Sequence, residues 1–97
     1  MKTLDEIRSS IRQHQDVLLE RFGVCVTGVF GSYVRGEQKR TSDLDVLVDI
    51  LRPISLLELV GAKLYLCDVL GVEVDVIPRR SLRRELRDAI LSEAVPV

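Results

Sequence analysis

Two short segments of the chain alternate apolar and polar side chains with a period of two residues, which is typical of β-strands with one face on a core. They are residues 43–50 and 72–77, and Pro78 directly follows the second. A third run, residues 24–30, is largely apolar on both faces and indicates a covered strand. The polar side of the first segment carries Asp43, Asp45 and Asp49, and that of the second carries Glu73 and Asp75. The pattern therefore predicts three strands, the last of them short or at an edge.

Three other segments place apolar residues three and four positions apart, the spacing of a helix with a buried face. Capping-box patterns begin at Thr3 and Ser55, and Gly23 and Gly71 follow as stop signals. We therefore predict helices over residues 4–22, from Ser55 to Gly71, and over residues 81–93. In the last helix the residues expected to point inward are Leu82, Leu86, Ala89 and Ile90. Residues 95–97 are left as a tail.

The predicted order is α-β-β-α-β-α, which indicates an α+β fold whose short mixed β-sheet is covered on one face by helices. With 97 residues, the chain has the size of one domain, residues 1–97. A chain this small buries only about 60 to 65 % of the surface of its unfolded state. A deep two-sided pocket would therefore need walls from a partner.

Charge and cysteine content exclude several classes of protein. Fourteen basic residues against 15 acidic ones give a formal net charge of -1, without the basic excess of a protein that binds nucleic acid alone. No apolar run approaches the roughly 20 residues that span a bilayer, and charges interrupt residues 1–12, so we expect a cytoplasmic chain without membrane contact. Cys25 and Cys67 lack a metal-ligand spacing and are expected to be buried free thiols.

The first chemical candidate is the aspartate pair on the predicted strand of residues 43–50. Asp43 and Asp45 stand two residues apart, so their carboxylates share a face about 7 Å apart and repel unless a cation lies between them. Magnesium prefers such oxygen ligands together with substrate phosphates. Asp75 joins this cluster if its strand lies beside theirs. By itself, the pair is more often a solvated face of a sheet.

The second candidate is Gly31-Ser32, which directly follows the predicted strand of residues 24–30. A glycine there lets the backbone approach a ligand closely, and a following helical turn would present free N–H groups to an anion. Alone, a Gly-Ser pair after a strand is usually an ordinary turn. A phosphate cradle followed by Asp-x-Asp and a third Asp, however, is the layout of a two-metal phosphoryl-transfer site. The chain has no GxxxxGK[ST] motif, which excludes a P-loop ATPase.

Together these residues resemble the minimal nucleotidyltransferases of the polymerase-β-like superfamily. The resemblance rests on Gly31-Ser32, ten intervening residues, Asp43-Leu44-Asp45 and the later Val74-Asp75-Val76, and it spans essentially the whole chain. It implies that Gly31 and Ser32 hold nucleotide phosphates and that Asp43 and Asp45 bind two Mg²⁺ ions. Asp75 would complete the metal site beside the attacking hydroxyl and accept its proton, and Arg35 matches a loop arginine that assists phosphate binding.

The same resemblance implies a role, because small free-standing members of this family are commonly antitoxins. The chain would then bind a helical HEPN-type ribonuclease toxin and transfer AMP from ATP to one of its tyrosines. One alternative is a nucleotidyltransferase that acts on RNA ends or on a small molecule with a helical partner subunit. Another is a non-catalytic binding module. A homo-oligomer also remains open.

The last predicted helix and its approach are rich in arginine. These residues are Arg79, Arg80, Arg83, Arg84 and Arg87. Glu85 and Asp88 lie among them, so a solvated face with ion pairs between neighbouring turns is one interpretation. The other is a docking surface for an acidic partner or for an RNA backbone, because the arginine side chain suits bidentate contact with carboxylate and phosphate. The lone His14 is expected to be an exposed helix residue rather than a catalytic base.

Overall fold

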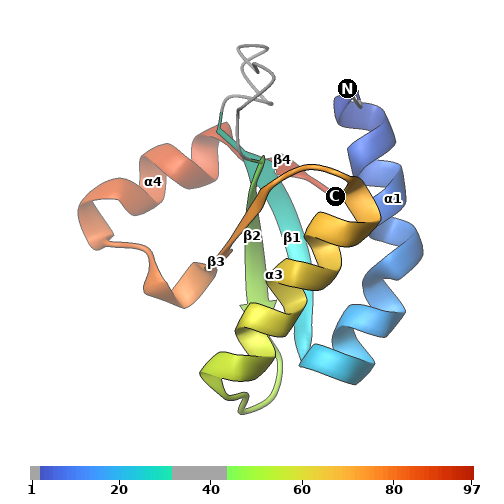
Figure 1. The fold of residues 1–97 in the computed structure, drawn as a ribbon. Helices are drawn as coiled ribbons and strands as arrows, with labels where there is room; N and C mark the ends of the chain where they lie inside the picture. Colours follow the sequence, from blue (N-terminus) through green and yellow to red (C-terminus); the bar gives the residue numbers. More distant parts are fainter. Residues whose placement is uncertain (1–2, 32–43) are drawn as a thin grey trace.

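The computed structural model describes residues 3–31 and 44–97 (Figure 1). Three α-helices are described, with a short helical turn after the first and another before the last. The helices and turns are α1 (Leu4–Val17), the π-helical turn η1 (Leu18–Phe22), α3 (Leu56–Leu70), the 3₁₀ turn η2 (Arg79–Ser81) and α4 (Arg84–Glu93). The strands are β1 (Val24–Phe30), β2 (Leu44–Ile50), β3 (Val74–Pro78) and β4 (Val95–Pro96). The predicted order of helices and strands is confirmed, and β4 is added at its end.

The four strands form one mixed sheet in the order β3-β2-β1-β4. β1 pairs antiparallel with both β2 and β4, whereas β2 and β3 are parallel. The parallel pair is joined by α3, the crossover that parallel strands require. β3 lies at an edge of the sheet, as predicted.

Local signals in the sequence explain where the helices begin and end. The Thr3 hydroxyl accepts a hydrogen bond from the Glu6 amide at 3.2 Å at the start of α1. Ser55 and Glu58 form a complete capping box at the start of α3. Gly23 and Gly71 end the two helical segments with φ of 68° and 69°, in the left-handed region that favours glycine.

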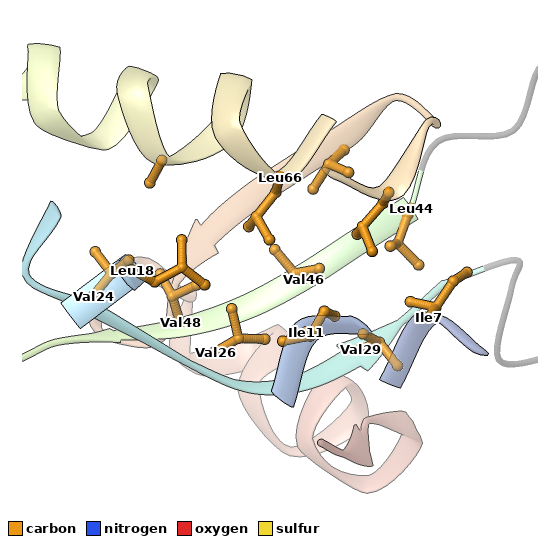
Figure 2. Close-up of a cluster of buried hydrophobic side chains, with 13 residues drawn as sticks. Ile7, Ile11, Leu18, Val24, Val26, Val29, Leu44, Val46, Val48 and Leu66 are labelled. Atoms are coloured by element: carbon orange, nitrogen blue, oxygen red, sulfur yellow. The ribbon is translucent and has the colours of Figure 1, made fainter. Parts of the chain in front are cut away.

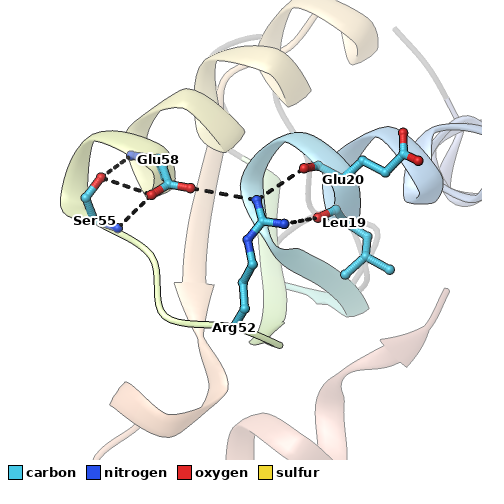
Figure 3. A network of polar contacts seen from close by, with 5 residues as sticks. All are labelled: Leu19, Glu20, Arg52, Ser55 and Glu58. Atoms are coloured by element: carbon cyan, nitrogen blue, oxygen red, sulfur yellow. Dashed lines mark hydrogen bonds and ion pairs between the residues drawn. The ribbon is translucent and has the colours of Figure 1, made fainter.

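One arginine connects the end of the first helical segment to the start of α3 (Figure 3). Arg52 donates from Nη2 to the Glu20 carbonyl at 3.1 Å and from Nη1 to the Leu19 carbonyl at 3.4 Å. It also pairs with the Glu58 carboxylate at 3.8 Å. The contact places a positive charge at a helix C-terminus, where carbonyls lack helical partners.

The main core lies between one face of the sheet and the helices α1 and α3. Figure 2 shows side chains from α1, η1, the strands and α3 pointing toward one another. The fully or almost fully buried members of this cluster are Ile7, Ile11, Leu18, Val24, Val26, Val29, Leu44, Val46, Val48, Ala62, Leu66, Leu70 and Val74. Phe30 and Leu47 are also buried but lie outside this cluster. The prediction of a mixed sheet with helices over one face is therefore confirmed.

Gln15 of α1 reaches across to the backbone of β1 beyond the short β4. Its side-chain amide donates to the Val26 carbonyl at 2.8 Å and accepts from the Val26 N–H at 3.1 Å. Next to this point the β1–β2 register shifts between Val26 and Gly28. The side chain of Gln15 thus satisfies two backbone groups where the ladder is irregular.

Three predictions at the C-terminal end are wrong. Residues 95–97 are not a loose tail, because β4 pairs with Gly28 and Val29 of β1. The last helix begins at Arg84 rather than at residue 81, since η2 and an extended stretch precede it. None of the residues of α4 is buried, and Leu86 and Ala89, both expected to point inward, are exposed, Leu86 at 52 %. Packing on this side of the molecule is therefore sparse.

Several single-residue predictions also change. His14 is half-buried rather than exposed: its Nδ1 lies 2.7 Å from the Ser10 carbonyl, and its ring packs edge-on against Tyr65. Cys25 and Cys67 are free thiols, as predicted, but only half-buried. Within residues 3–31 and 44–97, no helix combines the length and apolar character needed to cross a membrane.

Candidate active site

The site is built on the parallel pair β2 and β3. Asp45 and Asp75 are register partners across this pair, so their Cα atoms lie side by side on neighbouring strands. Because register partners in a sheet point to the same face, their side chains share one face at roughly the 4.8 Å spacing of adjacent strands. Their neighbours Leu44 and Val74 point to the core. The two aspartates therefore lie on the opposite face, where both are partly exposed.

The end of β1 lies against the same carboxylate. Phe30 is the register partner of Asp45, and Gly31 follows it with φ of 91°. A Cβ atom at Gly31 would overlap Oδ2 of Asp45. Only glycine satisfies both the backbone conformation and this close approach. Gly31, Asp45 and Asp75 thus meet at one end of the sheet.

Lys63 of α3 adds a positive charge that sequence reasoning missed. Its Nζ lies 3.5 Å from Oδ1 of Asp75, and both side chains are close to half exposed. An ammonium group at this distance reduces the repulsion between two neighbouring carboxylates. The only signal for it in the sequence is a lysine in a largely apolar helix, which does not reveal which strand it reaches.

Three predicted site residues, Ser32, Arg35 and Asp43, lie outside the described residues. Their assigned roles stay predictions. Among the described residues, no group of three or more His, Cys, Asp or Glu side chains could hold a metal ion. Asp45 and Asp75 supply two carboxylates on one face beside a backbone bend without a side chain. This donor chemistry fits magnesium, which is usually held by one or two carboxylates together with substrate phosphates.

Comparison with known proteins gives the family. The nucleotidyltransferase domain family matches residues 11–97. The protein adenylyltransferase MntA of Thermococcus cleftensis is 46 % identical over 97 residues, which cover 100 % of this chain and 98 % of the relative.

Solved structures agree with this assignment. A structure described as a minimal nucleotidyltransferase superposes with a TM-score of 0.81 at 38 % identity, covering 99 % of this chain and 97 % of the other. A complex of a tri-AMPylated HEPN toxin with an MNT antitoxin from Shewanella oneidensis matches with a TM-score of 0.65 at 16 % identity, covering 93 % and 70 %. At that identity, the second likeness shows the fold alone. From the family match, the full-length relative and the shared fold, we conclude that this chain belongs to the nucleotidyltransferase domain family and is a nucleotidyltransferase.

Proposed function

We propose that the chain transfers AMP from ATP to a hydroxyl group of a protein partner, that this hydroxyl is a tyrosine of a HEPN-type toxin, and that the transfer makes the chain an antitoxin. The observation that carries the proposal is the in-register placement of Asp45 and Asp75 beside the Gly31 bend. The named activity of the full-length relative, a protein adenylyltransferase, supports AMP as the transferred group. The fold shared with an AMPylated toxin–antitoxin complex supports the choice of partner.

The described residues have distinct parts in the proposed site. Asp45, with Asp43 from outside the described residues, would hold Mg²⁺, and Asp75 would complete the set. Bound magnesium would lower the pKa of the acceptor hydroxyl and neutralise the charge of the triphosphate. Gly31 lets the backbone lie directly against the Asp45 carboxylate, where a Cβ atom would overlap Oδ2. The backbone at this bend would hold a nucleotide phosphate beside the metal.

The proposed transfer forms one bond and breaks another at the α-phosphorus of ATP. The acceptor oxygen bonds to this phosphorus, and the bond to the bridging oxygen breaks, so that pyrophosphate leaves. The proton of the acceptor hydroxyl passes to the carboxylate of Asp75. Lys63, 3.5 Å from Oδ1 of Asp75, holds that carboxylate in place at the edge of the sheet. No protein nucleophile is required.

Transfer of label from α-³²P-ATP tests the proposal. The chain is incubated with magnesium and the purified product of the gene beside its own, and the labelled residue is identified by mass spectrometry. We expect label on a tyrosine of the partner. Asp45→Asn and Asp75→Asn should each lower the rate by about 100-fold or more. Each removes a carboxylate that would bind the metal, and Asp75→Asn also removes the proposed proton acceptor.

Asp16→Asn is the matched control, because Asp16 is exposed on α1 and lies outside the site. Its rate should equal that of the wild type, and all three variants should unfold at similar denaturant concentrations. Unchanged transfer by Asp45→Asn would contradict the assignment of the site. Label on RNA or on a small molecule, with none on the partner protein, would favour the alternative nucleotidyltransferase function.

A further inference from the structure

A polar cavity lies between β2, η2 and α4. It has a volume of about 480 Å³ and is lined by Asp49, Arg79, Arg80, Arg87 and Leu91. Asp49 follows Asp45 by four residues on β2, so by strand alternation the two side chains share a face of the sheet. At about 3.3 Å per residue, the cavity begins about 13 Å along the strand from Asp45. The cavity and the candidate active site therefore open on the same side of the molecule.

The cavity carries an excess of positive charge. Three guanidinium groups line it against one carboxylate, and that carboxylate is engaged, since Arg79 Nε lies 3.5 Å from Asp49 Oδ1. Within the described residues, neither Arg80 nor Arg87 forms an ion pair or a side-chain hydrogen bond. Both arginines are exposed. Arginine presents a planar fork of donors that matches a carboxylate, and here two such forks face one cavity.

Apolar side chains accompany this charge. Leu91 lines the cavity and is 40 % exposed, and Leu86 of the same helix is more exposed still. Since no residue of α4 is buried, the helix presents its leucines beside its arginines. Arginine is enriched at protein–protein interfaces and among the residues that carry their binding energy, and the exposed leucines beside it offer apolar area to the same partner.

We propose that this cavity and the adjoining leucines of α4 dock an acidic segment of the protein partner, which places the partner on the face that carries the active site. This inference rests on the proposed function, because it names the surface by which the protein acceptor is held. A nucleic acid fits the surface less well, since leucines gain nothing from a phosphate backbone and the chain carries no net positive charge. The triphosphate of ATP belongs to the Gly31 end of the sheet, about 13 Å away.

Charge reversal separates this docking role from chemistry. Arg80→Glu and Arg87→Glu are each compared with Arg12→Glu, the same change at an exposed position of α1. Binding of the purified product of the neighbouring gene is measured by calorimetry without ATP or magnesium. We expect the Kd to rise at least tenfold in each cavity variant and to stay unchanged in Arg12→Glu. In the labelling assay, the KM for the partner should rise while kcat stays within about twofold.

The outcomes distinguish this inference from the proposed function. Tight binding that the two reversals weaken, without any transfer of label by the wild type, would support the docking surface and overturn the proposed activity. Transfer by the wild type with the same Kd and KM in both variants would overturn the docking surface alone. The docking surface would also be overturned if the wild type bound a labelled single-stranded RNA and the two variants lost that binding while still binding the partner protein. Circular dichroism and thermal unfolding verify that α4 is folded in each variant. Arg87→Gln adds no negative charge and should raise the Kd less than Arg87→Glu does.

Discussion

The two faces of the sheet differ in both packing and chemistry. On one face, Val46 and Val48 of β2 lie fully buried under α1 and α3. On the other, Asp45 and Asp49 of the same strand are partly exposed, and the nearby α4 has no buried residue. Apart from Leu47, which lies between the two aspartates and is buried, the side chains of β2 therefore serve stability on one face and chemistry on the other. A substitution of an inward-facing valine of β2 should therefore affect mainly unfolding, and one of an outward-facing aspartate mainly transfer.

The largest effect on stability is expected in the covered face. Leu66→Ala removes a fully buried side chain of α3 and should lower the free energy of unfolding by about 2–5 kcal/mol, because it leaves a cavity in the core. Urea denaturation measures the change. Leu64→Ala is the matched control, since Leu64 lies two residues earlier on the same helix and is 61 % exposed. Equal losses in the two variants would break the comparison between buried and open surfaces.

The next largest effect lies where the backbone of β1 meets the active-site face. Gly31→Ala should lower the free energy of unfolding by about 2 kcal/mol and also reduce AMP transfer. The alanine must adopt a φ that is unfavourable for a residue with a side chain, and its Cβ atom displaces the Asp45 carboxylate.

Gly71→Ala is the control for that glycine variant. Gly71 has a similar positive φ, but a Cβ there would meet nothing within 4 Å. It should therefore show only the backbone strain, about 1 kcal/mol, with transfer unchanged. Equal losses of stability in the two glycine variants, with full transfer in both, would show that the close approach of Gly31 to Asp45 does not matter for transfer.

A smaller effect is expected at the contact between α1 and the irregular part of β1. Gln15→Ala should lower the free energy of unfolding by about 1–2 kcal/mol, because it leaves the Val26 N–H and carbonyl without their partner. Gln13→Ala, at an exposed position of the same helix, should be close to neutral. Hydrogen exchange at the Val26 amide gives a local readout, and unchanged protection there would contradict the assigned role of Gln15.

The smallest effect is expected on the open side. Leu86→Ala should change the free energy of unfolding by no more than about 0.5 kcal/mol, because the side chain is mostly exposed in the folded chain. The measurement is the urea midpoint. A loss as large as that of Leu66→Ala would mean that α4 packs on the sheet as tightly as α1 does.

Most of the fold could be predicted because its signals are local. The Ser55–Glu58 capping box and the glycines after α1–η1 and α3 mark helix ends through contacts within a few residues. β4 could not be predicted in this way, since two residues, one of them a proline, carry no periodicity. Leucines occur on all sides of α3, so the pattern could not show that Leu56 and Leu64 are exposed while Leu66 is buried.

The candidate site could be predicted in its residue types but not in its arrangement. The Asp45–Asp75 pair depends on β2 and β3 being parallel neighbours in one register, which no local pattern determines. The approach of Lys63 to Asp75 and of Arg79 to Asp49 likewise depends on how α3 and η2 pack. Long-range contacts of this kind become visible only in the folded chain.

The outer strands of the described sheet also restrict how the molecule can assemble. β3 includes Pro78 at its end, and β4 consists of only two residues, one of which is Pro96. Proline donates no backbone hydrogen bond, so both margins are poor templates for an incoming strand. A partner that adds a strand to a sheet edge would therefore form few backbone hydrogen bonds at either edge, and we expect partners to bind through side chains on the helices and on the open face.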